Sequence, residues 1–237
     1  MSAEQTKPCC GTCSSEPGAD LNAFIAGLRG RMTKPAEPTP LPERADVLEL
    51  REVVEGGDVV ARFEQGATAA GLTVHRTKAA DWPATVAAAL KANDVQTVVI
   101  EAQPNTVLTA ERAAVLAAAL AGAGVTVVAG CHDETLFTVG GAVTGVVGAV
   151  AETGTLVCVS GSESARGMSL IPPVHVAVVA AEQIAGDLFD LFTLLEGWNV
   201  LPANINLISG PSKTADIEGI LVTGVHGPGA VHVVVVE

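Results

Sequence analysis

Along most of the chain, stretches with apolar residues at helical spacing alternate with short apolar runs typical of strands. Together they predict repeated helix–strand units. Apolar residues at helical spacing fill residues 58–71, 81–94 and 109–124. Each of these stretches is followed by a short β-branched run bounded by turn residues, at 72–76, 95–102 and 125–130. Helices that alternate with buried strands are typical of crossover connections, so the pattern predicts an α/β fold built on an open, largely parallel sheet flanked by helices.

The C-terminal half continues the strand pattern with fewer helices. Buried strands are predicted at 154–160, 174–180, 204–209 and 230–237, which brings the sheet to about seven strands. Apolar residues on one face of 181–197 predict a helix there. The glycine-rich run 139–148 imitates a dinucleotide-binding loop only loosely, and a close-packed helix or turn is the favoured interpretation.

The first 44 residues differ in composition from the rest and predict two appendages. Residues 1–20 are small, polar and rich in turn formers, which indicates a flexible tail that carries Cys9, Cys10 and Cys13. Residues 21–44 combine a short amphipathic helix, expected to dock on another surface, with a proline-rich linker. The remaining residues, 45–237, are expected to form the α/β domain.

Charge narrows the choice of partners and compartment. The 237-residue chain has a formal net charge of −13, which excludes a nucleic-acid backbone as the default partner. No basic segment precedes an apolar stretch at the N-terminus, and five cysteines give no even disulfide framework, so a cytoplasmic protein is expected. The uncharged stretches 113–131 and 135–151 contain glycine breaks and β-branched runs, and we do not expect them to span a membrane.

The sequence predicts no cofactor held by this chain. Neither a dinucleotide-binding fingerprint nor a Walker loop occurs. Cys9, Cys10 and Cys13 include one C-x-x-C pair, whereas a closed zinc or iron–sulfur site usually needs four ligands. Cys131 and Cys158 lie far along the chain in apolar surroundings, so no metal site is expected.

Basic residues are scarce in the second half, which makes two of them informative. Beyond Lys91 the chain has only Arg112, Arg166 and Lys213. Arg166 lies in a glycine- and serine-rich loop after the predicted strand 154–160, where a planar guanidinium can hold a carboxylate or phosphate. The alternative is a surface arginine paired with Glu163.

Lys213 lies in a second polar loop, which follows the predicted strand 204–209. The stretch 215–222 is predicted to be a helix with Ser212 or Thr214 as its N-cap. A strand that leads into a loop and a helix start can cradle an anion, and Lys213 would add a positive charge there. Asp216 and Glu218 either complement the helix dipole or supply one acid, base or partner for Lys213.

His226 lies between glycines just before the last predicted strand. Imidazole is the natural proton carrier near neutral pH, so this side chain is a candidate for acid–base chemistry. A surface or hydrogen-bonded structural role is the alternative interpretation. His175, inside the predicted strand 174–180, is expected to be a core histidine whose hydrogen-bonding needs are met.

Two long motifs resemble the LUD-domain family, and within it the group called lactate utilization protein C. They are "AETGTLVCVSG" with "ARGMSLIPPVHV", and "SGPSKTADIEGILVTGVHGP" with the last strand. The resemblance implies the NagB/RpiA/CoA-transferase-like fold and a role with two iron–sulfur partner proteins that oxidise L-lactate to pyruvate. The family usually has arginine where this chain has Lys213, and lysine lacks the bidentate geometry of arginine.

The family motifs map onto candidate site residues in this sequence. The candidates for catalysis are Glu152, Asp216, Glu218 and His226. The candidates for ligand binding are Thr153, Gly154, Ser160, Gly161, Arg166, Ser209, Gly210, Ser212, Lys213 and Thr214. We expect the two motif loops to converge on an anion pocket at the carboxyl ends of the strands.

Three functions remain open from the sequence. The leading hypothesis is an accessory subunit that binds a small acidic metabolite and iron–sulfur lactate-utilisation proteins, with the clusters held by those partners. The second is a free-standing enzyme of isomerase or transferase type that acts on a phosphorylated or acyl metabolite. The third is a metabolite- or redox-sensing module that uses the N-terminal cysteines.

Overall fold

The computed structural model of the chain describes residues 19–31, 58–130, 133–161, 164–198, 201–215 and 221–237. The chain divides into two units, Met1–Gly57 and Asp58–Glu237. In the first unit the described residues form one helix, α1 (Ala19–Arg31), where the sequence predicts a helix. Its docking role remains a prediction. The predicted tail with Cys9, Cys10 and Cys13, the linker and the expected boundary at residue 45 lie outside the described residues.

The second unit is built on a parallel sheet, as the alternating pattern predicts. Six strands lie in the order β1-β12-β7-β4-β2-β3, and every pairing between neighbours is parallel. The strands are β1 (Thr73–Thr77), β2 (Thr97–Glu101), β3 (Thr126–Val127), β4 (Gly141–Gly145), β7 (Val174–Ala180) and β12 (Ala230–Val236). The prediction of an α/β fold with an open parallel sheet is therefore confirmed.

The three predicted crossover helices are present, and two of them cover one face of the parallel sheet. They are α3 (Val59–Ala70), α4 (Trp82–Ala92) and α5 (Ala110–Gly122). Apolar side chains of α4 and α5, among them Val86, Leu90 and Leu116, pack in one cluster with Val143 and Val176 of the sheet. Burial of these apolar residues holds the helices on the sheet.

A second, smaller sheet and α3 cover the opposite face. The strands β5 (Gly148–Val150), β6 (Thr155–Ser160), β8 (Ile184–Ala185) and β9 (Asn204–Ile208) pair in the order β8-β5-β6-β9, and β6 is antiparallel to both of its neighbours. The sequence predicted β6 and β9 as strands but assigned them to the main sheet. Short buried strands look alike in sequence whichever sheet they join, so periodicity could not separate the two sheets.

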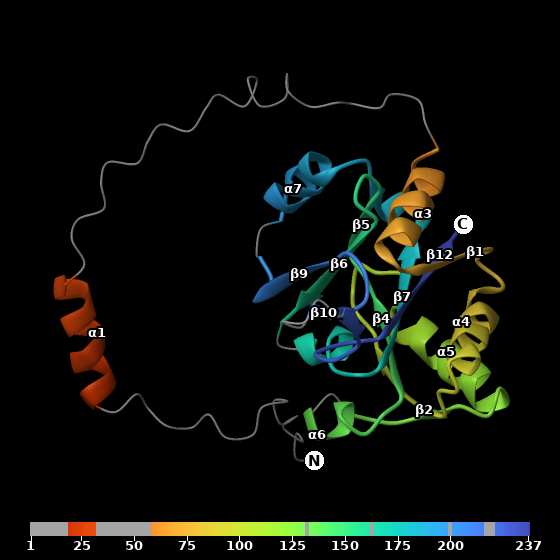
Figure 1. The fold of residues 1–237 in the computed structure, drawn as a ribbon, viewed down its shortest axis with the longest axis horizontal. Coiled ribbons are helices and arrows are strands. Elements are labelled where there is room, and N and C mark those ends of the chain that lie inside the picture. The colour runs from red at the N-terminus through yellow and green to blue at the C-terminus, as the bar shows by residue number, and fades with distance from the viewer. Residues whose placement is uncertain (1–18, 32–57, 131–132, 162–163, 199–200, 216–220) are drawn as a thin grey trace, which may run out of the picture. The chain divides into compact units, whose positions relative to one another are not determined.

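The outer side of the second sheet carries α7 (Leu188–Glu196). Leu191 and Leu195 pack against Val150 and Val157 of the second sheet. The strands of the domain lie between α7 and the pair α4 and α5 (Figure 1). The predicted helix 181–197 is longer than α7, because Ala181–Gln183 forms a 3-10 turn, β8 follows, and the Asp187 side chain then caps α7.

The glycine-rich run 139–148 is a buried strand rather than a helix or turn, so that interpretation was wrong. Its central part is β4, which lies between β7 and β2. A Cβ on Gly145 would overlap the side chain of Thr106. The close backbone approach expected of these glycines is present, but in a strand.

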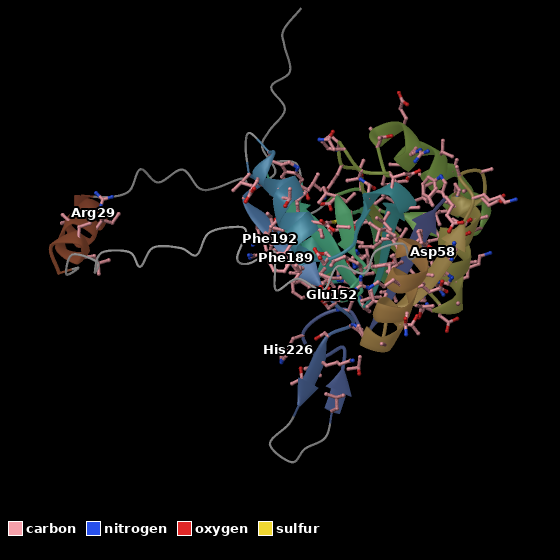
Figure 2. All side chains as sticks on the ribbon, turned by 90° about the horizontal axis from the view of Figure 1, so that it is seen from above. Arg29, Asp58, Glu152, Phe189, Phe192 and His226 are labelled. Carbon is pink, nitrogen blue, oxygen red and sulfur yellow. The ribbon has the colours of Figure 1, made fainter. Side chains whose placement is uncertain are left out.

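The described residues of the predicted helix 215–222 are not helical, and residues 216–220 lie outside the part of the chain that the structure describes. Residues Lys213–Ala215 form β10 and residues Leu221–Thr223 form β11, and the two pair as an antiparallel hairpin. At Ala215, Leu221 and Val222, strand pairing prevails over the helical stripe that the sequence suggests. Figure 2 shows this hairpin projecting from the body of the domain.

No helix among the described residues is both long and apolar enough to cross a bilayer. The uncharged stretch 113–131 contains most of α5 and the strand β3, with a turn between them. The stretch 135–151 includes β4 and β5.

Candidate functional site

The parallel sheet defines two edges, and the candidate residues divide between them. We call the side where β1, β2, β4, β7 and β12 begin the amino edge, and the side where they end the carboxyl edge. Open parallel sheets usually bind ligands outside the carboxyl edge. The position of each motif loop relative to these edges therefore decides whether it can contribute to a ligand site of the usual kind.

The antiparallel pairing of β6 and β9 sends the two motif loops to opposite ends. Ser160 at the end of β6 pairs with Asn204 at the start of β9, and Leu156 pairs with Ile208. The loop after β6 and the loop after β9 thus leave the second sheet on opposite sides. The expected convergence of both loops assumed two parallel strands, and this pairing removes that geometry.

The start of the first motif meets the start of the second beside the C-terminal half of α3. Thr153 Oγ1 and Thr155 Oγ1 lie 2.6 Å apart, and Thr155 Oγ1 lies 2.6 Å from Ser209 Oγ. Gly154 has φ +62°, and a Cβ there would overlap the backbone of α3 at Gly66 and Ala67. The family motifs therefore bring Thr153, Gly154 and Ser209 together in a packed junction.

Gly210 and Lys213 extend this junction to the end of α3. A Cβ on Gly210, which has φ +123°, would lie 2.5 Å from the Ala70 carbonyl oxygen. Lys213 Nζ donates a hydrogen bond of 3.3 Å to the same oxygen. A cation is favourable at a helix C-terminus, where carbonyl groups lack partners. The described helix end beside Lys213 is therefore the C-terminus of α3, and Thr214 lies in β10 rather than at an N-cap. Binding of an anion by this loop remains a prediction.

The two motif segments meet again at the amino edge, where Gly229 N donates to Pro173 O at 2.9 Å. Ser212 N donates to Pro228 O at 2.9 Å, and Gly224 N donates to Ser212 O at 2.8 Å. A Cβ on Gly227 would lie 3.2 Å from Ser212 Cβ and 3.4 Å from the Leu170 carbonyl oxygen. The turn that carries His226 is thus held against the segment that follows the 3-10 helix Arg166–Ser169.

The remaining candidates are exposed or undescribed. The side chains of Glu152, Arg166 and His226 are exposed, and Figure 2 shows His226 beside the projecting hairpin. Thr214 lies in β10 of that hairpin. Asp216 and Glu218 lie outside the described residues. Ligand binding or catalysis by these residues remains a prediction.

A cavity of about 700 Å³ lies at the carboxyl edge. The segments that follow β2, β4 and β7 contribute to it, together with the end of β6 and the C-terminal end of α7. Its lining residues from the first motif are Val159, Ser160 and Gly161, and neither Arg166 nor Lys213 is among its described lining residues. The sequence analysis missed most of the rest, including Gln103, Asn105, Gln183 and Trp198.

Glu101, at the end of β2, is buried directly behind this cavity. Gln103 Nε2 donates to Glu101 Oε2 at 2.8 Å, and Ser164 Oγ donates to Glu101 Oε1 at 3.0 Å; both donors line the cavity. Burial raises the pKa of the Glu101 carboxyl above its usual value. A carboxyl with a raised pKa can give or take a proton nearer neutral pH. The sequence analysis missed Glu101, although a charged residue at the end of the apolar predicted strand 95–102 could have indicated it.

No group of three or more potential metal ligands occurs among the described residues. Cys158, in β6, is a buried free cysteine. Burial, together with the negative charge of Glu101, raises the pKa of its thiol to about 12. Cys158 is therefore protonated at neutral pH and is a poor nucleophile or metal ligand.

The fold and the cavity define this chain as an α/β protein with a ligand-sized site at the carboxyl edge of a parallel sheet. The model of the LUD domain matches residues 60–236, and the chain belongs to this family. The resemblance noted in the sequence is therefore confirmed.

Curated relatives match over a smaller part of the chain. An uncharacterized protein of Neisseria meningitidis serogroup B is 43% identical over 82 residues, 33% of this chain and 34% of that protein. Lactate utilization protein C of Bacillus licheniformis is 37% identical over 92 residues, 37% of this chain and 38% of that protein. Lactate utilization protein C of Halalkalibacterium halodurans is 39% identical over 92 residues, 37% and 40% respectively. The matched part thus spans less than half of each relative's length.

A solved structure agrees with the fold. It is the crystal structure of a DUF162 family protein from Deinococcus radiodurans, with a TM-score of 0.53 and 24% sequence identity. The comparison covers 76% of this chain and 96% of that one. At this identity the likeness concerns the fold.

Proposed function

We propose that this protein is a component of an L-lactate utilisation system in the cytoplasm. The observation that carries this proposal is the similarity to relatives named lactate utilization protein C, together with membership of the LUD domain family. The protein acts as an accessory subunit to iron–sulfur proteins that oxidise L-lactate to pyruvate, and the clusters belong to those partners.

The projecting hairpin is the surface that we assign to partner contact. Leu221, Val222 and Val225 are 60%, 43% and 50% exposed, and they lie within or beside the hairpin. Exposed apolar groups that gather on one element favour protein–protein contact. Lys213, His226 and Arg166 add polar groups that can meet an acidic metabolite or an acidic partner surface.

Growth on L-lactate tests the role. Deletion of the gene from the source organism should abolish growth on L-lactate while growth on glucose continues, and the full-length gene should restore it. A full-length gene with Leu221→Ser and Val222→Ser should fail to restore growth although the protein accumulates and folds. Normal growth of the deletion strain on L-lactate as the sole carbon source would remove the proposal.

Co-purification under anaerobic conditions tests the accessory role separately. Tagged full-length protein should recover iron and an L-lactate-dependent reduction of an artificial electron acceptor, and the hairpin variant should recover neither. An iron-free protein that reduces the acceptor alone would contradict the accessory role.

A free-standing enzyme is the second candidate, and Glu101 is the observation that favours it. A buried carboxyl with a raised pKa, bonded to two residues of a cavity wall, is a common arrangement for acid–base catalysis. In that case the isolated protein turns over a phosphorylated or acyl metabolite, and Glu101→Gln abolishes turnover without loss of fold. Unchanged turnover in this variant would exclude Glu101 as the acid or base.

A further inference from the structure

The lining of the carboxyl-edge cavity includes a set of large apolar residues and a set of polar residues, which we call its apolar wall and its polar wall. Leu194 and Trp198 of the α7 region, with Leu201 and Pro202 from the segment before β9, supply large apolar groups. The polar wall carries amide and hydroxyl side chains, namely Gln103, Asn105, Ser160, Ser164 and Gln183. A flat molecule with one hydrogen-bonding edge suits such a cavity better than a small, fully polar one.

The charges at the cavity disfavour a small carboxylate such as lactate. Among the described lining residues, Glu182 is the one charged side chain, and neither lysine, arginine nor histidine is present. The Glu101 carboxyl lies behind Gln103 and Ser164. A bound anion would face acidic groups without a cation to offset the loss of its hydration.

The polar wall is held in place by its own hydrogen bonds. Gln183 Nε2 donates to Asn105 O at 3.1 Å, and Gln183 Oε1 accepts from Ala180 N at 3.1 Å. These bonds join the segments after β2 and β7, so the wall exists before any ligand arrives. A preformed wall lowers the entropy cost of binding.

Asn105 combines this fixed position with an unusual backbone. Its φ of 63° lies in the left-handed region, where non-glycine residues are uncommon and where asparagine is tolerated best. Its side-chain amide offers a donor and an acceptor side by side. An amide of this kind matches a ring edge that also carries a donor beside an acceptor.

The size of the cavity agrees with such a ring. A volume of about 700 Å³ falls within the range of sites for drug-sized ligands. The indole of Trp198 and the neighbouring leucines give an aromatic ring an apolar surface to pack on. No lysine, arginine or histidine is among the described lining residues to offset the charge of a phosphate, so the lining favours an uncharged ring.

We propose that this cavity binds an uncharged heteroaromatic ring whose edge carries a hydrogen-bond donor beside an acceptor, the class that includes nucleobases and nicotinamide. Trp198 packs on the ring, and the Asn105 amide pairs with its edge. The site is separate from the hairpin surface and does not depend on the lactate role.

Calorimetric titration of the full-length protein tests the proposal with three probes: adenosine, nicotinamide and L-lactate. At least one neutral ring should bind saturably, and L-lactate should not. The chain has two tryptophans, and Trp82 is buried in the core at 3% exposure, away from the cavity lining, so we expect a ligand-induced change in fluorescence to come from Trp198. The fluorescence change with the bound ring should disappear in Trp198→Phe.

Two matched glycine variants locate the site. Asn105→Gly keeps the left-handed backbone but removes the amide, and it should weaken binding of the ring about three- to tenfold. Asp94→Gly makes the same kind of change at the other left-handed non-glycine residue of the described chain, between α4 and β2 at the amino edge, and should leave binding unchanged. Thermal melting confirms that both variants are folded.

Three results would overturn the proposal. The first is the absence of saturable binding for both neutral rings. The second is equal affinity for the ring in Asn105→Gly and the unmodified protein. The third is saturable binding of L-lactate that Asn105→Gly weakens, because the cavity would then accept a small anion.

Discussion

His175 shows how much a single buried side chain can contribute to the pH dependence of this protein. It is fully buried in β7, and its Nε2 lies 2.8 Å from Thr144 Oγ1. No partner for its Nδ1 is found among the described residues. Burial lowers the pKa of this imidazole to about 4, so the folded protein holds it neutral.

This lowered pKa predicts a loss of stability in acid. Below the ordinary pKa of 6.5 the unfolded chain binds a proton that folded His175 refuses until about pH 4. The free energy of unfolding should therefore fall as the pH drops through this window, by about 3 kcal/mol from this group. Denaturant titrations at pH 7 and pH 4.5 measure the difference.

The variant His175→Gln should show a smaller difference between the two pH values, whatever its stability at pH 7. The exposed His226→Gln serves as the control and should keep the original difference. An undiminished difference in His175→Gln would show that other groups cause the acid sensitivity.

Gly154 is the second residue with a large predicted effect. It has φ +62°, and an added Cβ would overlap the backbone of α3. Gly154→Ala should lower the free energy of unfolding by about 2–4 kcal/mol, through backbone strain and displacement of the helix. Gly161→Ala is the matched control, since nothing lies within 4 Å of its added Cβ. Equal melting temperatures for the two variants would contradict the packed junction between Gly154 and α3.

At the scale of elements, the helix ends are where local chemistry is clearest. Asp58 Oδ1 accepts a hydrogen bond of 3.1 Å from Ala61 N at the start of α3. Asp81 precedes α4 but makes no such side-chain bond. Aspartate before an apolar helical stretch is a common start signal, so the sequence alone does not distinguish these two positions.

This contrast gives a prediction for the two caps. Asp58→Ala should lower the free energy of unfolding by about 1 kcal/mol, because the first turn of α3 loses a hydrogen-bond acceptor. Asp81→Ala should lower the free energy of unfolding by clearly less, because the Asp81 side chain makes no cap hydrogen bond. The exposed contact of 4.0 Å between Asp58 and Arg76 adds little to the difference. Equilibrium denaturation curves of the two variants check the ranking. A larger loss of unfolding free energy for Asp81→Ala than for Asp58→Ala would contradict it.

The crossover units of the first half could be predicted from sequence, because each helix and strand has its own hydrophobic periodicity and is bounded by turn residues. The hairpin formed by β10 and β11 could not, since its strands have three residues each and are held by pairing with one another. A three-residue strand shows no period of its own, and its conformation depends on its partner.

At the scale of the whole molecule, the family motifs were recognisable in the sequence while their meeting points were not. Ser160 and Gly161 line the cavity, whereas Ser209 and Gly210 pack beside α3. Strand direction within the second sheet causes this division, and strand direction follows from tertiary pairing. For the same reason the cavity wall from α7 and the segment after β2 escaped the sequence analysis.

The position of β12 has a consequence for protein synthesis. This strand is the last of the sheet in the sequence, yet it lies between β1, the first strand, and β7. On the ribosome β1 emerges more than a hundred residues before its neighbour. We therefore expect the nascent chain to keep β1 without a strand partner, and open to chaperones, until β12 has left the exit tunnel.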